Sequence, residues 1–395
     1  MVRGGSGVYF DKFSTRIGSR QVFNYPYGVI GTGLAGPYFA DPFPDLSGTE
    51  FPVTPVIPSP IPYYAGGVPI AGLRTPINGN FVDPDFRTPY VYVYNFGLQW
   101  EPAHHYAAEL DYVGNKGTKL IDVRTLNQGV GATAPYTASG FSNNKVLNGL
   151  QMIETTAGAH YDSLQASLKR RSSSLDFLLS YTFSKSIDEH SGAPANELSA
   201  LPGDQQNRRS QRGISDFDRT HRLVANFVWF PKEVYSGASR IAGHLLNDWQ
   251  FSGIVTVQSG VPFSVISTNG AAIYNRADLV RAGNGAKEGS VKSRLDAYFD
   301  PTAFAVSLAT APPFGSSSRN ILRGRGQKSV DFSIGKSVRV TATNRLEFRA
   351  EFFNIFNFAN FGLPNNNMTV PGTVGRITST STGPRVVQCA LKYSF

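Results

Sequence analysis

The most constraining feature of this sequence is an alternation of apolar and polar residues that recurs along most of the chain. In Tyr90–Glu101 the even positions are aromatic or aliphatic, and the odd positions include Asn95, Gly97 and Gln99. Period-two alternation is typical of a β-strand whose two faces meet different surroundings. Helical periodicity is scarce, so we predict an all-β protein.

The alternation predicts about ten strands. They lie near Val2–Phe13, Tyr90–Glu101, Tyr106–Tyr112, Tyr161–Arg171, Leu175–Lys185, Leu223–Trp229, Trp249–Val265, Val330–Arg339, Leu346–Phe352 and Val387–Phe395. Constant parity across Trp249–Val265 favours one long strand there, although Pro262 lacks a ladder donor.

Short and long connections alternate strictly between these strands. The short ones lie near 101–105, 170–174 and 341–344, and 231–248 is intermediate; the long ones are roughly 14–87, 127–160, 188–219, 268–327 and 359–383. Loops beyond about 15 residues are uncommon in compact domains. Long loops at one end of an up-and-down antiparallel sheet are typical of transmembrane β-barrels, which have short periplasmic turns and long extracellular loops.

The two faces of the predicted strands agree with a membrane wall. One face is aromatic and aliphatic, and the other carries Ser, Thr, Gln, Asn and some charge, as expected for a wet lumen. Only 16% of residues are charged, against about 25% in a typical soluble protein. Aromatic side chains near strand ends suit interfacial girdles: Tyr90, Trp100, Tyr112, Trp229, Trp249 and Tyr393.

Several other classes of protein are disfavoured. Cys389 is the only cysteine, and the six histidines form no His-Glu-x-x-His pair, so we expect no metal centre. The net charge is +9 without a block of five like charges, which argues against nucleic acid as a partner. Gly31–Gly36 fits G-x-G-x-x-G, but prolines follow where a helix must start, so we expect no nucleotide cofactor. No catalytic residues are predicted, and the chain is not expected to be an enzyme.

Neither the longest uncharged stretch nor the amino terminus predicts a membrane helix or a leader. Phe51–Leu73 is long enough to span a bilayer but contains six prolines, so we predict a loop. Met1–Gly7 is not followed by the apolar run of a signal peptide. We therefore expect either a cytosolic protein or a fragment of something longer.

A set of short segments resembles a known family when their order and spacing are taken together. These segments are Arg87–Tyr90, Tyr161–Gln165, Ser180–Asp188, Asp216–Arg222, Asp248–Gln250, Gln258–Phe263, Arg349–Asn357, Asn360–Gly362 and Tyr393–Phe395. Over nearly its whole length the chain resembles the carboxyl-terminal part of a TonB-dependent outer-membrane receptor barrel of the Oar-like group.

The resemblance implies a fold, a location and partners. Residues 1–395 would supply about ten strands of a probable 22-strand barrel in the Gram-negative outer membrane, without signal peptide, plug or amino-terminal regulatory-like domain. Implied partners are outer-membrane lipid, the remaining strands and plug, TonB acting through that plug, and the outer-membrane assembly machinery. The implied function is binding and uptake of a large scarce solute that the sequence does not identify.

Three groups of residues are candidate sites. The resemblance implies that Tyr393 and Phe395 belong to the carboxyl-terminal signal for barrel assembly. A second group, Glu347, Arg349 and Glu351, shares a polar strand face. These are either lumen charges that contact a plug or ligand, or cross-strand pairs, which we favour. The third group, Arg208, Arg209 and Arg212, is either an anionic-ligand loop for phosphate or carboxylate, including lipopolysaccharide, or a solvated basic loop, which we favour.

Other constellations are interpreted structurally. The charged residues between Asp216 and Arg222 suggest a salt-bridged loop base rather than an acid–base centre. Asp188–His190 are too close in sequence to converge on a metal. Phe10–Phe51 is aromatic-rich and forms either a ligand-stacking loop or a packed rim. Cys389 is predicted to be an inert residue on the lipid face.

Two alternatives remain open at this stage. A ten-strand barrel could close by itself, since even strand numbers from eight upward occur, and serve a structural, adhesion or secretion-related role in the outer membrane. A soluble, secreted β-sandwich that binds glycans is the weaker alternative.

Overall fold

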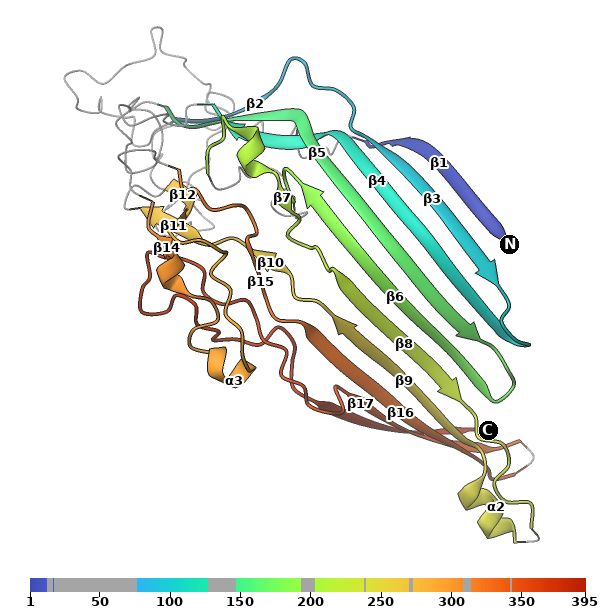
Figure 1. The fold of residues 1–395 in the computed structure, drawn as a ribbon. Coiled ribbons are helices and arrows are strands. Elements are labelled where there is room, and N and C mark those ends of the chain that lie inside the picture. Colours follow the sequence, from blue (N-terminus) through green and yellow to red (C-terminus); the bar gives the residue numbers. More distant parts are fainter. Residues whose placement is uncertain are drawn as a thin grey trace, which may run out of the picture.

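A single large antiparallel sheet dominates the computed structural model of the chain. The structure describes residues 1–12, 17, 77–126, 147–192, 203–237, 239–269, 273–307, 314–341 and 343–395. Ten strands form the main path of the sheet, each beside the next along the chain (Figure 1). In spatial order they are β1 (Val2–Phe10), β3 (Tyr90–Trp100), β4 (Tyr106–Thr125), β5 (Leu147–Arg170), β6 (Leu175–Asp188), β8 (His221–Trp229), β9 (Trp249–Gln258), β16 (Gln327–Arg339), β17 (Arg345–Phe353) and β18 (Val386–Ser394).

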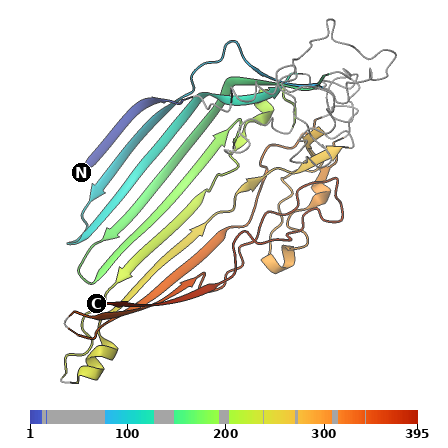
Figure 2. The ribbon, with the colours of Figure 1, turned by 180° about the vertical axis from the view of Figure 1, so that it is seen from behind.

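Short turns lie at one end of this sheet and long loops at the other, as predicted. The turns span 101–105, 171–174, 230–248 and 340–344. The long connections span 11–89, 126–146, 189–220, 259–326 and 354–385, and their described parts gather at the opposite end of the strands (Figures 1 and 2). The up-and-down topology therefore has a turn end and a loop end.

The strand prediction is wrong in two regions, for different reasons. β4 and β5 run far past the predicted strands, to Thr125 and back to Leu147. Register shifts after Gly117 break the period-two pattern there, so the sequence alternation gives no signal of this extension. β2 (Ile77–Val82) pairs in parallel with the extended part of β5.

The predicted strand Trp249–Val265 is also divided. β9 ends at Gln258, and the chain leaves the sheet so that β10 (Pro262–Phe263) pairs with β15 (Leu322–Arg323). Gly260 lies against the carbonyl oxygen of Gly324 so closely that a side chain there would collide with it. The apolar parity continues past the end of β9 because Phe263 and Val265 are buried in a separate core formed by the loops.

Basic and aromatic residues mark the borders of an apolar band on the outer face of the sheet. At the turn end these residues are Tyr106, Arg170, Trp229 and Lys336, and Leu175 of β6 lies beside Trp229. Eight to ten residues further along the same strands, at the loop end, they are Lys116, His160, Lys185, His221 and Lys328. Ten residues of tilted strand rise by about 25 Å, which matches the apolar band of outer-membrane barrels.

Large apolar side chains fill this band and are exposed to the surroundings. They include Phe96, Leu164, Leu179, Phe183, Phe348 and Leu391. At the turn end, Arg170 lies over the ring of Tyr106 at 5.4 Å and Lys336 over Trp249 at 5.0 Å, as expected for amphipathic groups at a lipid boundary. The free Cys389 is exposed on this outer face, as predicted. Tyr112, in contrast, lies inside β4 rather than at a strand end.

The sheet is curved but not closed. Among the described residues, β1 pairs only with β3, and β18 pairs only with β17. Each edge strand therefore presents a row of backbone groups without a partner strand, and an open edge is not tolerated in lipid. No helix among the described residues is long and apolar enough to cross a membrane.

The loops at one end have a small core of their own. It is built mainly from 259–326, which contains β11 (Ile266–Asn269), β12 (Ile273–Arg276), β13 (Asp278–Leu279), α3 (Val291–Arg294), η3 (Pro301–Ala303) and β14 (Phe304–Ala305). Phe299 is fully buried among Phe263, Val265, Phe304 and Leu322. Met368 and Val374 from the last long loop pack against this cluster. The described parts of these loops therefore form an ordered cap rather than independent hairpins.

Lipid contact of the outer face predicts opposite effects for two adjacent residues of β6. Leu179 lies on the outer face near mid-strand, and Ser180 on the inner face. We expect Leu179→Arg to lower the free energy of unfolding in phospholipid vesicles by about 2–4 kcal/mol. Ser180→Arg, measured in the same urea titration, should change it by less than about 1 kcal/mol; equal losses would contradict the assignment of the faces.

Candidate functional site

The inner face of β17 carries a row of charged side chains. Glu347, Arg349 and Glu351 occupy alternate positions, with their outward neighbours Phe348 and Ala350 between them. Arg349 Nε lies 3.2 Å from Glu351 Oε1. A further arginine, Arg345, places Nη1 3.9 Å from Glu347 Oε1. The ion pairs therefore run along the strand, whereas the interpretation favoured from the sequence was pairing across strands.

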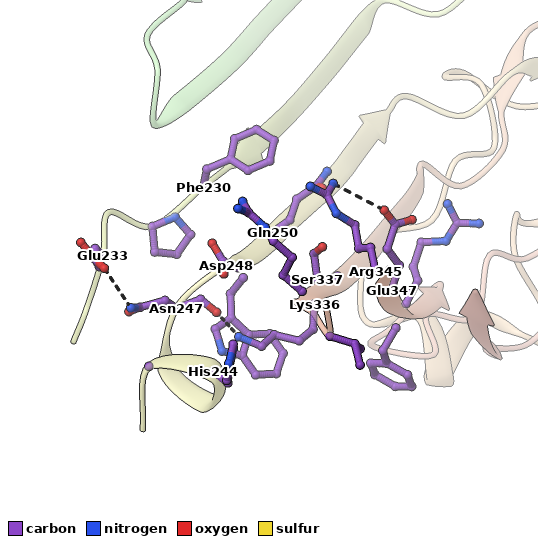
Figure 3. Close-up of a pocket in the computed structure, with 18 of the residues that line it drawn as sticks. Phe230, Glu233, His244, Asn247, Asp248, Gln250, Lys336, Ser337, Arg345 and Glu347 are labelled. Atoms are coloured by element: carbon purple, nitrogen blue, oxygen red, sulfur yellow. Dashed lines mark hydrogen bonds and ion pairs between the residues drawn. The ribbon is translucent and has the colours of Figure 1, made fainter. Parts of the chain in front are cut away.

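These charges line a cavity of about 1430 Å³ at the turn end (Figure 3). Its wall includes the inward side chains Gln250, Ser252, Ser333 and Ser337, and the turn 230–248 adds Glu233 and His244. The lining is polar and carries both signs of charge. A polar space bounded by ion pairs between partly exposed side chains can receive a polar surface.

The loop end is organised differently, around a buried guanidinium. Arg319, from the loop 259–326, is almost fully buried and reaches the inner end of β6. Its Nη2 lies 2.6 Å from Asp188 Oδ1 and 3.2 Å from Asp216 Oδ1, and its Nη1 donates to the backbone oxygens of Asp188 and Gln211. One side chain thus connects three segments that are far apart in sequence.

Neighbouring arginines repeat this arrangement. Arg323 Nη2 lies 2.6 Å from Asp218 Oδ2, which is buried, and Arg219 Nη1 donates to the backbone oxygen of Ser259. Arg276 donates to Ser317 O and Gln211 Oε1. Burial, and next the charge of Arg319, lower the pKa of Arg276 to about 10, so it stays charged at physiological pH. The interpretation of Asp216–Arg222 as a salt-bridged loop base is confirmed.

Arg208 belongs to a second ionic cluster, on the extended parts of β4 and β5. It lies in the 3-10 helix η2 (Arg208–Gln211) and pairs with Glu154 at 2.7 Å, Asp122 at 3.2 Å and Glu189 at 3.6 Å. The three carboxylates balance its charge. These partners could not be predicted from the alternation, because Asp122 and Glu154 lie on strand extensions that it does not reveal and Glu189 lies in the loop after β6.

The other two arginines of the predicted anion loop are placed differently. Arg209 and Arg212 are exposed, and neither pairs with a carboxylate in the part of the chain that the structure describes. The three arginines therefore do not converge, and Arg209 and Arg212 are left as charges that face solvent.

The remaining sequence candidates divide among separate contacts. Asp188, Glu189 and His190 turn to Arg319, Arg208 and Asp122 respectively. Over the described ranges there is no group of three His, Cys, Asp or Glu side chains placed to hold a metal ion. Apart from its first residues and Ile17, the aromatic-rich Phe10–Phe51 lies outside the described residues, as does Gly31–Gly36.

The terminal aromatic residues lie at the turn end of β18. Tyr393 accepts a hydrogen bond of 2.6 Å from Asn344 Nδ2 and faces outward, opposite Leu346. Phe395 follows the strand and is 95% exposed. Both are accessible on the last strand, which is also an open edge.

Comparison with known proteins decides the family. A family model described as outer membrane beta barrel domain matches residues 1–388. The chain belongs to this family. The predicted class of fold and the Gram-negative outer membrane as its location are thereby confirmed. No curated protein matches the sequence significantly.

Solved structures similar to the chain are much longer than it is. The outer membrane transporter YddB from Escherichia coli aligns with a TM-score of 0.46 and 11% identity, covering 81% of this chain and 34% of YddB. The siderophore receptor PirA from Acinetobacter baumannii aligns with a TM-score of 0.39 and 13% identity, covering 79% of this chain and 32% of PirA. For P. aeruginosa FpvA, solved with a bound pyoverdine–iron complex, the TM-score is 0.40 at 10% identity, over 78% of this chain and 27% of FpvA. The outer-membrane barrel protein described here thus spans about a third or less of these chains.

The buried position of Arg319 predicts a large effect of its removal. Arg319→Met leaves the carboxylate of Asp188 buried without its partner, which typically costs about 3–5 kcal/mol. We expect the loop 259–326 to become sensitive to proteolysis while the strands stay protected. Arg281→Met is a matched control in the same loop, because Arg281 pairs with Asp300 in an exposed position. Arg281→Met should lower the free energy of unfolding by less than about 1 kcal/mol. Equal sensitivity of the loop to proteolysis in the two variants would contradict this account.

Proposed function

We propose that this chain is the carboxyl-terminal part of the barrel of a TonB-dependent receptor, which binds a large scarce solute and imports it. The observation that carries the proposal is the open wall: ten strands with a polar inner face and two edges without partner strands. In lipid such edges must pair, and loops as bulky as 259–326 suit a wide barrel better than a narrow ring. The family-like segments between Arg87 and Phe395 support the same assignment.

In this proposal the loop end and the turn end of the sheet have different roles. The ordered cap at the loop end presents the surface that meets the solute. The cavity beside β17 faces the position that a plug occupies, and its Glu347, Arg349 and Glu351 contact the plug or the passing solute. TonB acts on that plug, and the energy comes from the inner membrane. The chain supplies the wall, and no covalent step is required.

One prediction of this proposal concerns what the chain can do alone. Expressed alone in a strain that lacks the complete receptor, it should not restore accumulation of the solute, whereas the complete receptor should. In this proposal TonB acts through a plug, and residues 1–395 are assigned to the barrel wall. Uptake by the isolated chain, dependent on the proton gradient, would overturn the proposal.

The alternative is a stand-alone barrel with a structural, adhesion or secretion-related role, which requires β1 and β18 to meet. The native Cys389 on the outer face of β18 makes this testable. Cysteines placed at Gly4, Ser6 and Val8, the outward positions of β1, should not crosslink to Cys389 in membranes if the ring includes further strands. Efficient crosslinking from one of the three positions would favour the stand-alone ring.

We also propose that Arg209 and Arg212 form an attractive surface for an anionic group of the solute. Both are exposed beside the cap, whereas the charge of Arg208 is balanced by carboxylates. Replacing both with Gln should raise the solute concentration for half-maximal uptake by the complete receptor several-fold, and more at low salt. Lys169→Gln with Arg171→Gln, which removes the same charge from exposed positions at the turn end outside the cavity, should not. An unchanged concentration dependence would assign the two arginines to an ordinary solvated loop.

A further inference from the structure

The turn 230–248 is the longest connection at the turn end, and it is built as a fixed unit. It contains the helix α2 (Arg240–Leu246), capped by Ser239, whose Oγ accepts from Ala242 N at 3.3 Å. Asn247 Oδ1 accepts from the backbone nitrogens of Val234 and Tyr235 at 2.8 and 2.9 Å. Ser239 thus caps the helix, and Asn247 ties the end of the turn to its first half.

The carboxyl end of α2 is attached to the lipid-facing side of the sheet. Trp249 Nε1 donates to Leu245 O at 2.9 Å, and Lys336 Nζ donates to Asn247 O. Trp249 and Lys336 face each other across β9 and β16 on the outer face, where Lys336 also lies over the Trp249 ring. The helix therefore ends at the turn-side border of the apolar band.

The turn exposes an unusual amount of apolar surface for a segment outside the band. Ile241 is 75% exposed, Leu245 64% and Val234 66%. Ile241 and Leu245 are four residues apart and so lie on one side of the helix. Ser239, Gly243 and Asn247 line the polar cavity from the other side. The apolar side of α2 therefore points away from the cavity.

We propose that α2 is a lipid anchor, with Ile241 and Leu245 inserted among the phospholipid headgroups of the inner leaflet. Short turns of outer-membrane barrels lie on the periplasmic side, so the turn-side border of the band meets this leaflet. Trp249 lies on the lipid-facing surface and donates to the backbone oxygen of Leu245, so the carboxyl end of α2 is held directly beside that surface. This attachment, together with the exposed apolar side chains of the helix, identifies lipid as the occupant. Burial of apolar helix side chains in the headgroup region is a known mode of peripheral binding. The inference depends on the outer-membrane location and not on solute transport.

Two positions of the same helix provide the test. In a Cys389→Ser background, Ile241→Cys and His244→Cys are labelled with an environment-sensitive fluorophore. His244 is the matched control because it lines the cavity. The whole protein that carries this chain is reconstituted in phosphatidylcholine vesicles containing nitroxide lipid. We expect nitroxides at headgroup and shallow-chain depth to quench the label at 241 at least threefold more than the label at 244, and aqueous iodide to show the reverse order.

Leu245→Cys serves as a second reporter, which should behave like position 241. The side chains of Ile241 and Leu245 are exposed, so their replacement should not disturb folding. Circular dichroism of each labelled protein checks that the barrel has folded. Ready access of iodide to position 241 in vesicles would overturn the anchor, whatever the access at position 244. Protection of 241 in native membranes but not in pure vesicles would assign the surface to a periplasmic protein instead, and would equally overturn the lipid assignment. Loss or retention of solute uptake bears on neither result.

Discussion

The structure depends on one constraint: backbone hydrogen-bonding groups in a bilayer must find partners within the protein. Eight of the ten strands satisfy this constraint by pairing with a neighbour on each side, while β1 and β18 pair on one side only. The shape of the sheet follows, because strands that pair in sequence order with short turns form a continuous wall. The same constraint makes the two free edges the most consequential feature of the fold. They require pairing with each other or with strands outside this wall.

The two surroundings of the wall then determine the residues on each face. Lipid selects Leu179 and Phe183 outward, and water in the interior tolerates Ser180 and Thr182 between them. Height along the membrane normal is fixed by amphipathic residues. Arg170 and Lys336 mark the turn-side border, and Lys116 and Lys185 the loop-side border. Because cations and aromatic rings suit the headgroup region, these borders fix the depth of the sheet without any contact to a second protein.

The sequence predicted the wall because period two is a local property that each strand carries by itself. The prediction was wrong where the alternation of residue types does not coincide with the actual pairing of the strands. β4 passes irregular register beyond Gly117 without ending, and β9 ends at Gln258 although the parity continues. The loop-base cluster at Asp216–Arg222 could be interpreted from composition, but its partner Arg319 is about a hundred residues away. Arg208 illustrates the same limit, since only the folded loops bring Glu154 and Asp122 to it.

The two ionic regions of the wall differ in how firmly they are held, and this difference bears on function. At the loop end, Arg319 and Asp188 are both buried, so breaking their pair is costly and the cap keeps its position on the wall. At the turn end, Arg345 pairs with Glu347, and Arg349 with Glu351, on side chains that are largely open to water. Such pairs contribute about 0–1 kcal/mol and can exchange partners readily. In the proposed receptor, the firmly held loops would provide a stable surface for the solute, and the exchangeable inner charges would provide a replaceable contact for the plug. A barrel with a purely structural role requires the first property but gains nothing from the second.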